Sequence, residues 1–83
     1  MIKDSDYNLT CFLTLREIGL NIKISNKLTQ GLIKNNWRSI LNKNLLRIGF
    51  TEFKIKQILD SIEDKLIIKE REDYELWSAS TSF

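Results

Sequence analysis

Apolar residues recur at helical spacing through the middle of the chain, over residues 26–48. The stripe consists of Leu28, Leu32, Ile33, Trp37, Ile40, Leu41, Leu45 and Ile48. Spacings of three and four residues place side chains on one face of a helix, and Ser25 or Asn26 can cap its first turn. Gly31 and the Asn pair at 35–36 weaken the middle of this pattern. The pattern therefore predicts one helix over 26–48 or two shorter helices.

The next predicted helix has the clearest boundaries. Gly49 supplies a stop for the preceding element, and Thr51 can cap a helix that carries several apolar residues. These are Phe53, Ile58, Leu59, Ile62 and Leu66. Phe50 and Ile55 occupy the two positions of a hydrophobic staple, which fixes the angle of the chain before a helix. The last turns hold the acids Asp60, Glu63 and Asp64. The helix dipole disfavours acids near the end of a helix. Either packing stabilises this end, or the acids have another role.

Residues 9–24 fit two different elements. Apolar residues at odd positions from Leu9 to Leu15 alternate with polar or aromatic ones, which is a strand pattern. The same residues also fit a helix stripe, and the Leu-Arg-Glu-Ile run favours a helix. Leu20, Ile22 and Ile24 alternate as in a short strand. The sequence leaves this segment open.

The period changes after Lys65. Two apolar runs, 66–70 and 74–77, flank the polar Arg71-Glu72-Asp73, and this arrangement predicts a C-terminal β-hairpin. Helices followed by a hairpin indicate the α+β class, a small helical domain similar in element order to a winged helix-turn-helix. We expect residues 1–8 and 78–83 to be flexible ends and residues 9–77 to form a single globular domain.

The composition argues against most enzyme chemistry. The 83 residues include no His, no Pro and one cysteine, Cys11. Without histidine the chain lacks the usual general base near neutral pH and the commonest metal ligand. One cysteine closes no internal disulfide and completes no zinc site. We therefore expect no enzymatic activity, no cofactor, no bound metal and no small-molecule substrate. Cys11 is expected to be a small buried apolar residue.

The predicted location is the cytoplasm. The opening residues MIKDSDYN are polar and acidic, which is not the pattern of a secretory signal. No window approaches the roughly 18 apolar residues of a membrane span, so we expect no membrane contact. Ile, Lys and Asn, which AT-rich codons encode, are frequent. This usage indicates an AT-rich genome, such as that of a low-GC bacterium, a phage, a plasmid or an organelle.

The small net charge of +2 hides a strong asymmetry along the chain. Residues 27–56 carry seven basic side chains and one acid, a net charge of +6, whereas residues 57–83 carry a net charge of −4. Such an asymmetry can direct an anionic partner to one side of a molecule. The same charges also suit ordinary solvated helix faces.

Residues 13–34 contain a set of apolar and polar positions with a characteristic spacing. These positions are Leu13, Thr14 and Glu17, then Ile22, Ile24 and Ser25, then Leu32, Ile33 and Lys34. In this spacing the segment resembles the helix-turn-helix of excisionase and MerR-type DNA-binding proteins. The resemblance implies that the first helix supports the motif and that the helix after the serine enters the major groove.

A candidate nucleic-acid-binding face follows from that resemblance. Lys27, Gln30, Lys34 and Arg38 fall on one face of the helix predicted over 26–48. The three cations could contact phosphates, and Gln30 could contact a base edge. The predicted function is therefore a non-enzymatic nucleic-acid-binding regulator. An ordinary solvent-facing stripe would show the same spacing.

The acidic C-terminal segment supports a different partner. A wing that grips DNA should be basic, yet residues 70–75 carry a net charge of −3 and would be repelled. The alternative function is a small protein-docking factor: an inhibitor, an immunity or anti-defence protein, or a subunit of a larger assembly. Its predicted protein-binding residues are Glu72, Asp73, Tyr74 and Trp77, because aromatic residues are enriched in interface hot spots.

Overall fold

The chain folds into four helices. The computed structural model describes the backbone of residues 3–81 and the side chains of residues 3–72. The helices are α1 (Asp4–Glu17), α2 (Ile22–Thr29), α3 (Trp37–Arg47) and α4 (Glu52–Thr81). The described residues contain no strand, so the predicted α+β class is wrong and the domain is all-α. No described helix has a stretch long and apolar enough to cross a membrane.

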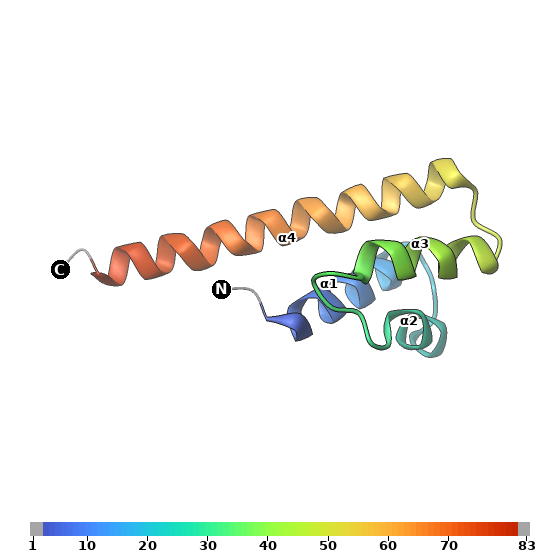
Figure 1. Ribbon diagram of the computed structural model, residues 1–83, viewed down its shortest axis with the longest axis horizontal. Coiled ribbons are helices and arrows are strands. Elements are labelled where there is room, and N and C mark those ends of the chain that lie inside the picture. Colours follow the sequence, from blue (N-terminus) through green and yellow to red (C-terminus); the bar gives the residue numbers. More distant parts are fainter. Residues whose placement is uncertain (1–2, 82–83) are drawn as a thin grey trace.

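Helices α1 and α3 contact α4, and α2 joins the bundle through α1 and α3. Helix α1 packs against α2 and α4, and α3 packs against α2 and α4 (Figure 1). Helix α4 is the longest, with 30 residues, and it extends past the beginning of α1 (Figure 1). The end of α1, the start of α2, the end of α3 and the start of α4 all meet at one end of the molecule. This end carries the candidate site.

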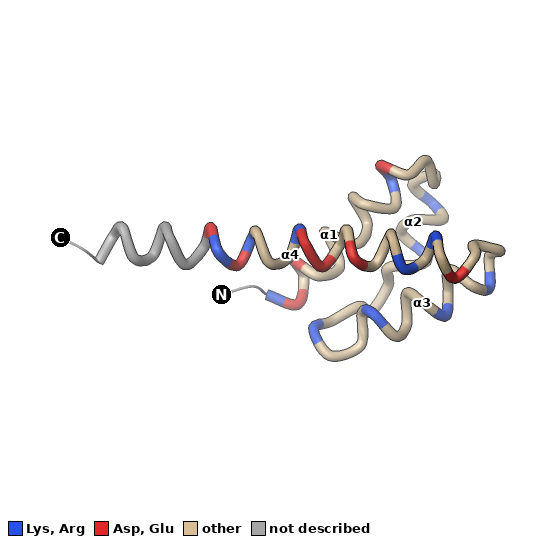
Figure 2. Tube along the Cα trace, turned by 90° about the horizontal axis from the view of Figure 1, so that it is seen from above, with Lys and Arg blue, Asp and Glu red and all other residues tan. Residues whose placement is uncertain are grey.

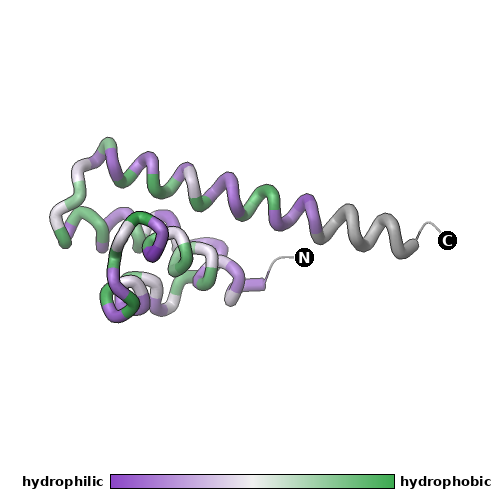
Figure 3. The backbone as a smooth tube through the Cα atoms, turned by 180° about the vertical axis from the view of Figure 1, so that it is seen from behind, coloured by the Kyte–Doolittle hydropathy of each residue, from purple (hydrophilic) through white to green (hydrophobic). Residues whose placement is uncertain are grey.

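One apolar core joins all four helices. Hydrophobic and hydrophilic residues alternate along the part of α4 whose side chains are described, in keeping with a helix that is buried on one side only (Figure 3). The core consists of Tyr7, Cys11, Leu15, Leu28, Leu32, Trp37, Leu41, Leu45, Ile55, Ile58, Leu59, Ile62 and Leu66. The buried polar residues Thr14, Ser25 and Thr29 bond neighbouring carbonyls, and no buried side-chain polar atom lacks a partner in the described part.

The segment that the sequence left open is helical. Helix α1 begins at Asp4, inside the segment expected to be a flexible end, and its Tyr7 is part of the core. Gly19 has a φ of 104°, a left-handed conformation that ends α1. Asn21 then caps α2, because its Oδ1 accepts a hydrogen bond of 2.8 Å from the Ile24 N–H. The result is a helix, a short turn and a second helix.

The apolar stripe over 26–48 is divided between two helices. Gly31 has a φ of 74°, and residues 30–36 form a connection between α2 and α3. Asn36 holds this connection, because its Oδ1 accepts a hydrogen bond of 2.8 Å from the Ile33 N–H. Leu32 remains buried at 2% exposure although it lies outside a helix. Its place in the core explains why the spacing resembled that of one continuous helix.

The predicted joint between α3 and α4 is confirmed. Gly49 has a φ of 107° directly after the last turn of α3. Thr51 caps α4, since its Oγ1 accepts a hydrogen bond of 3.2 Å from the Lys54 N–H. At the two staple positions, Phe50 packs against the core and Ile55 is buried within it. Local sequence signals were sufficient at this joint.

The predicted C-terminal hairpin is wrong, because its residues belong to α4. The sequence after Gly49 contains neither glycine nor proline, so nothing interrupts a helix that Thr51 has started. Leu66 continues the buried stripe of α4, and Ile67 and Ile68 are the exposed residues beside it. The short apolar run suggested a strand because a run of this length fits either element. The acids Asp60 and Glu63 therefore lie in the middle of a longer helix, away from its negative end.

Candidate nucleic-acid interface

The structure separates the four residues of the predicted nucleic-acid-binding face. Lys27 lies in α2, Gln30 is its C-cap residue, Lys34 lies in the 30–36 connection, and Arg38 lies in the first turn of α3. Lys34 lines a small cavity of about 220 Å³ with the acids Glu63 and Glu70. These four residues therefore share no helical face, and the reason is the break at Gly31.

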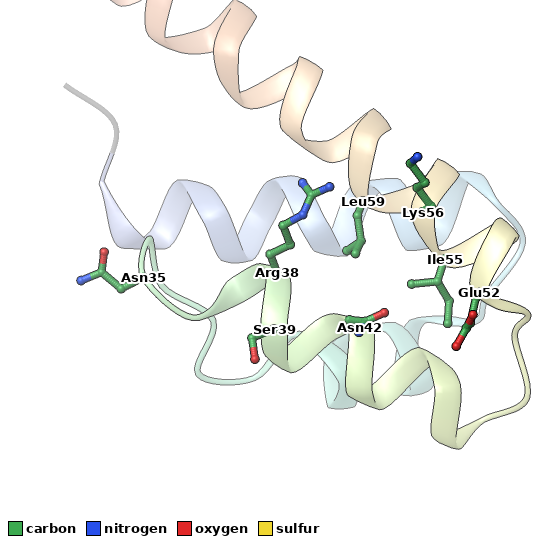
Figure 4. A pocket seen from close by; sticks show the side chains of 8 residues that line it. All are labelled: Asn35, Arg38, Ser39, Asn42, Glu52, Ile55, Lys56 and Leu59. Carbon is green, nitrogen blue, oxygen red and sulfur yellow. The ribbon is translucent and has the colours of Figure 1, made fainter.

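Arg38 is directed toward α4. Figure 4 shows its side chain rising from α3 toward α4, and it lines a cavity of about 470 Å³ together with Leu59 and Lys56. Its guanidinium bonds Asp60 at 3.0 Å and Glu63 at 3.1 Å. These carboxylates compensate its charge, so Arg38 is a weak candidate for phosphate binding. Asp60 and Glu63, the acids that the sequence placed late in a helix, are thus held by an ion pair with Arg38.

Two lysines of α4 also form ion pairs with acids of another helix. Lys65 Nζ lies 2.7 Å from Glu17 Oε2, and Lys69 Nζ lies 2.8 Å from Asp6 Oδ1, so both pairs tie α4 to α1. The Lys69 ammonium and the backbone N–H of Lys3 lower the pKa of Asp6, because both stabilise its ionised form. We call this group the ion-paired flank. It consists of Arg38, Lys65 and Lys69 with Asp6, Glu17, Asp60 and Glu63.

Six other basic residues gather where the helix ends meet. Lys and Arg positions of α2, the second half of α3 and the start of α4 lie toward the same end of the molecule (Figure 2). We call this group the basic end: Lys23, Lys27, Lys43, Arg47, Lys54 and Lys56. All six are exposed, and none forms an ion pair within the described part of the chain. Their charges remain available to an anionic partner.

The exposed side of α2 carries polar groups suited to nucleic acid. Lys23, Asn26, Lys27 and Gln30 follow each other at spacings of three, one and three residues, and all are exposed. These spacings place them on one side of the helix. Ser25, Leu28 and Thr29 occupy the opposite, buried side. We call the exposed set the α2 face; Asn and Gln can bond adenine edges, and lysine can contact guanine or phosphate.

A groove between α2 and α3 adjoins this face. It has a volume of about 480 Å³ and is lined by Leu20, Ile24, Lys27, Leu28, Asn44, Arg47, Ile48 and Phe50. Asn44 Nδ2 donates a hydrogen bond of 3.5 Å to the Leu28 carbonyl, which joins α3 to the end of α2. Lys27 and Arg47 lie along the same groove, so charges from two helices act together here.

The predicted protein-binding residues all belong to α4. Glu72 is exposed on this helix. Asp73, Tyr74 and Trp77 fall within the backbone bounds of α4, but their side chains lie outside the described residues. A partner protein at these residues would therefore meet a helix and not the edge of a β-hairpin.

The one cysteine of the chain lies in the core. Cys11 is fully buried in the core, and burial raises the pKa of its thiol to about 12, which keeps it protonated. The expected buried role of Cys11 is confirmed. Within the described residues no group of three His, Cys, Asp or Glu side chains is placed to hold a metal ion.

The sequence-based prediction missed several residues of this candidate interface. Lys23 and Asn26 complete the α2 face with the predicted Lys27 and Gln30, and Arg47 reaches the same groove from α3. Gly19 followed by Asn21, a stop and a cap, was the signal that could have started a helix at Ile22. The position of Arg47 beside Lys27 had no local signal, because it depends on how α3 packs.

The chain matches no protein-family model, no curated protein and no solved structure. The resemblance of residues 13–34 to excisionase and MerR-type proteins therefore remains a prediction. The geometry differs from it in one respect: α2 begins at Ile22, and Ser25 lies buried inside the helix and not ahead of it.

Proposed function

We propose that the chain is a small, non-enzymatic nucleic-acid-binding protein that acts in the cytoplasm. The α2 face contacts the bases or the groove, and the other cations of the basic end contact phosphates. The observation that carries this proposal is the contrast between two groups of basic residues. The ion-paired flank has its charges compensated, whereas the six cations of the basic end have no acidic partner among the described residues.

The physical reason is electrostatic. Cations that neutralise phosphates release condensed counterions, and this release supplies much of the affinity for nucleic acid. Lys23 and Lys27 stand on the α2 face next to two polar amides, Asn26 and Gln30. Phosphate contacts position a protein on the duplex, whereas amide side chains can read base edges. The α2 face thus combines both kinds of group on one short helix.

The test is binding of a fluorescent 20-base-pair DNA duplex, measured by anisotropy at low salt. We expect the double change Lys23→Glu and Lys27→Glu to weaken binding by at least about a hundredfold, because two attractive contacts become repulsive. The matched control is Lys3→Glu with Lys34→Glu. Both of these lysines are exposed, lack an ion pair among the described residues and give the same change in net charge.

The control separates location from total charge. We expect it to weaken binding only a few-fold, and far-UV circular dichroism should show the same helix content in both variants. Equal losses in the two variants would mean that net charge alone drives binding. A wild-type chain that binds no duplex at low salt would remove the proposal altogether.

A protein-docking function is the second candidate, and the exposed apolar residues of α4 favour it. Beyond Leu66, Ile67 and Ile68 are each more than half exposed, next to the acids Glu70 and Glu72. On a helix these residues suit a partner that offers an apolar groove. For this function Ile68→Arg should remove a co-purifying protein, whereas the Lys23/Lys27 double change should leave it bound.

A further inference from the structure

The α2/α3 groove has the chemistry of a site for a small apolar anion. Its walls are five apolar side chains, Leu20, Ile24, Leu28, Ile48 and Phe50. Ile24 and Ile48 are 39% and 45% exposed, so the groove is open to ligands from solvent. Leu20 and Phe50 line it directly after Gly19 and Gly49, the positive-φ glycines that end α1 and α3.

The charges along the groove have one sign. Lys27 and Arg47 are its only charged lining residues, and neither pairs with an acid among the described residues. Asn44, its remaining polar lining residue, already donates to the Leu28 carbonyl. Apolar walls strengthen the field of nearby cations because they exclude water. A carboxylate suits this position, since an arginine fork can bind both of its oxygens.

The size of the groove is compatible with a small molecule. Ligand pockets commonly measure about 300–1,000 Å³, and this groove measures about 480 Å³. We infer that the α2/α3 groove binds a free apolar carboxylate, such as a medium-chain fatty acid, with its chain on the apolar walls and its head between Lys27 and Arg47.

This ligand site has a consequence for the proposed function. Lys27 belongs both to the α2 face and to the groove, and a bound carboxylate compensates its charge. The ligand should therefore compete with nucleic acid, and only this regulatory step rests on the proposed function. Binding of the carboxylate itself needs no nucleic acid, so the two can fail separately.

The experiment is a titration of the ¹⁵N-labelled full chain with decanoate, followed by amide shifts in the absence of nucleic acid. We expect saturable shifts confined to α2, the end of α3 and the two turns at the groove. Decyltrimethylammonium has the same chain length with a cationic head, and it should cause no such shifts. Equal binding of the two amphiphiles, or decanoate shifts outside the groove, would overturn the inference.

Matched variants locate the ligand. Ile48→Glu places an acid on the groove wall, and Leu46→Glu places one at an equally exposed position of the same segment outside the groove. We expect Ile48→Glu to weaken decanoate binding at least tenfold and Leu46→Glu to leave it unchanged within twofold. Likewise Arg47→Gln should weaken binding several-fold, whereas Lys43→Gln should not. Equal effects within either pair would contradict the site.

Discussion

The ion-paired flank and the basic end use the same residue types with opposite results. In the flank, Arg38 contacts two carboxylates, and Lys65 and Lys69 contact one each. At the basic end, six exposed cations have no such partner in the described part of the chain. Every residue involved carries a full charge in isolation. The fold alone decides which charges are compensated within the chain and which remain for a partner.

This difference follows from the direction of the helices. The two acids of α1 in the flank lie beside lysines of α4, because α1 and α4 run alongside one another. The two acids in the middle of α4 lie beside the arginine of α3 for the same reason. The basic end forms where helix termini meet, and the acid-rich part of α4 is directed away from it (Figure 2). The comparison therefore predicts that substitutions in the flank change stability and that substitutions at the basic end change binding.

The largest expected effect concerns the core that the two regions share. Leu45, next to the basic end in α3, and Ile62, next to Glu63 of the flank, both have 0% exposure. Each change to alanine should lower the free energy of unfolding by about 2–5 kcal/mol, because it leaves a cavity. Urea denaturation measures this, and a single transition is expected in both variants. Separate transitions would mean that the two regions do not form one cooperative unit.

The next effect is the salt dependence of nucleic-acid binding. With about four phosphate contacts, affinity for duplex DNA should fall roughly a hundredfold between about 50 and 200 mM salt. The free energy of unfolding should change far less, since the exposed pairs of the flank contribute little and are screened. Anisotropy and urea denaturation over the same salt series test both statements. A flat binding curve would count against phosphate contacts from the basic end.

A crossed pair of arginine variants tests the division directly. Arg38→Gln removes the contacts with Asp60 and Glu63, and we expect it to cost roughly 0.2–1 kcal/mol of stability for each exposed pair while DNA affinity stays within twofold. Arg47→Gln should do the reverse: DNA affinity falls several-fold and stability is unchanged. The same two measurements on both variants suffice. Matching profiles would show that the two regions do not differ in role.

The smallest effect is a pH dependence that originates in the flank. The pKa of Asp6 is lowered by Lys69 and by the Lys3 N–H, so the folded state favours the ionised carboxylate. This contribution is present above the ordinary pKa of aspartate and is lost as the pH falls through the lowered folded value. Asp6→Asn should therefore reduce the loss of stability on acidification below about pH 4. Urea midpoints from pH 7 down to pH 3 measure it, with Asp4→Asn as the control.

Local signals predicted one joint of this protein, between α3 and α4, better than they predicted its elements. At the α3–α4 joint, Gly49, Phe50 and Thr51 act within a few residues of one another, and their predicted roles are confirmed. Farther along, a short apolar run at 66–68 suggested a strand, although the absence of glycine and proline after Gly49 indicated a continuous helix. The error arose because periodicity over so few residues cannot distinguish a strand from a buried helix segment.

The sequence by itself determined the charge asymmetry, the buried cysteine, the joint at Gly49 and two members of the α2 face, Lys27 and Gln30. Only the tertiary structure decided that Arg38 is compensated and that Arg47 joins Lys27 along one groove. The physical reason is the range of each effect. Caps and turns depend on neighbours in the chain, whereas the fate of a surface charge depends on which helix packs beside it, and that is fixed only when the core forms.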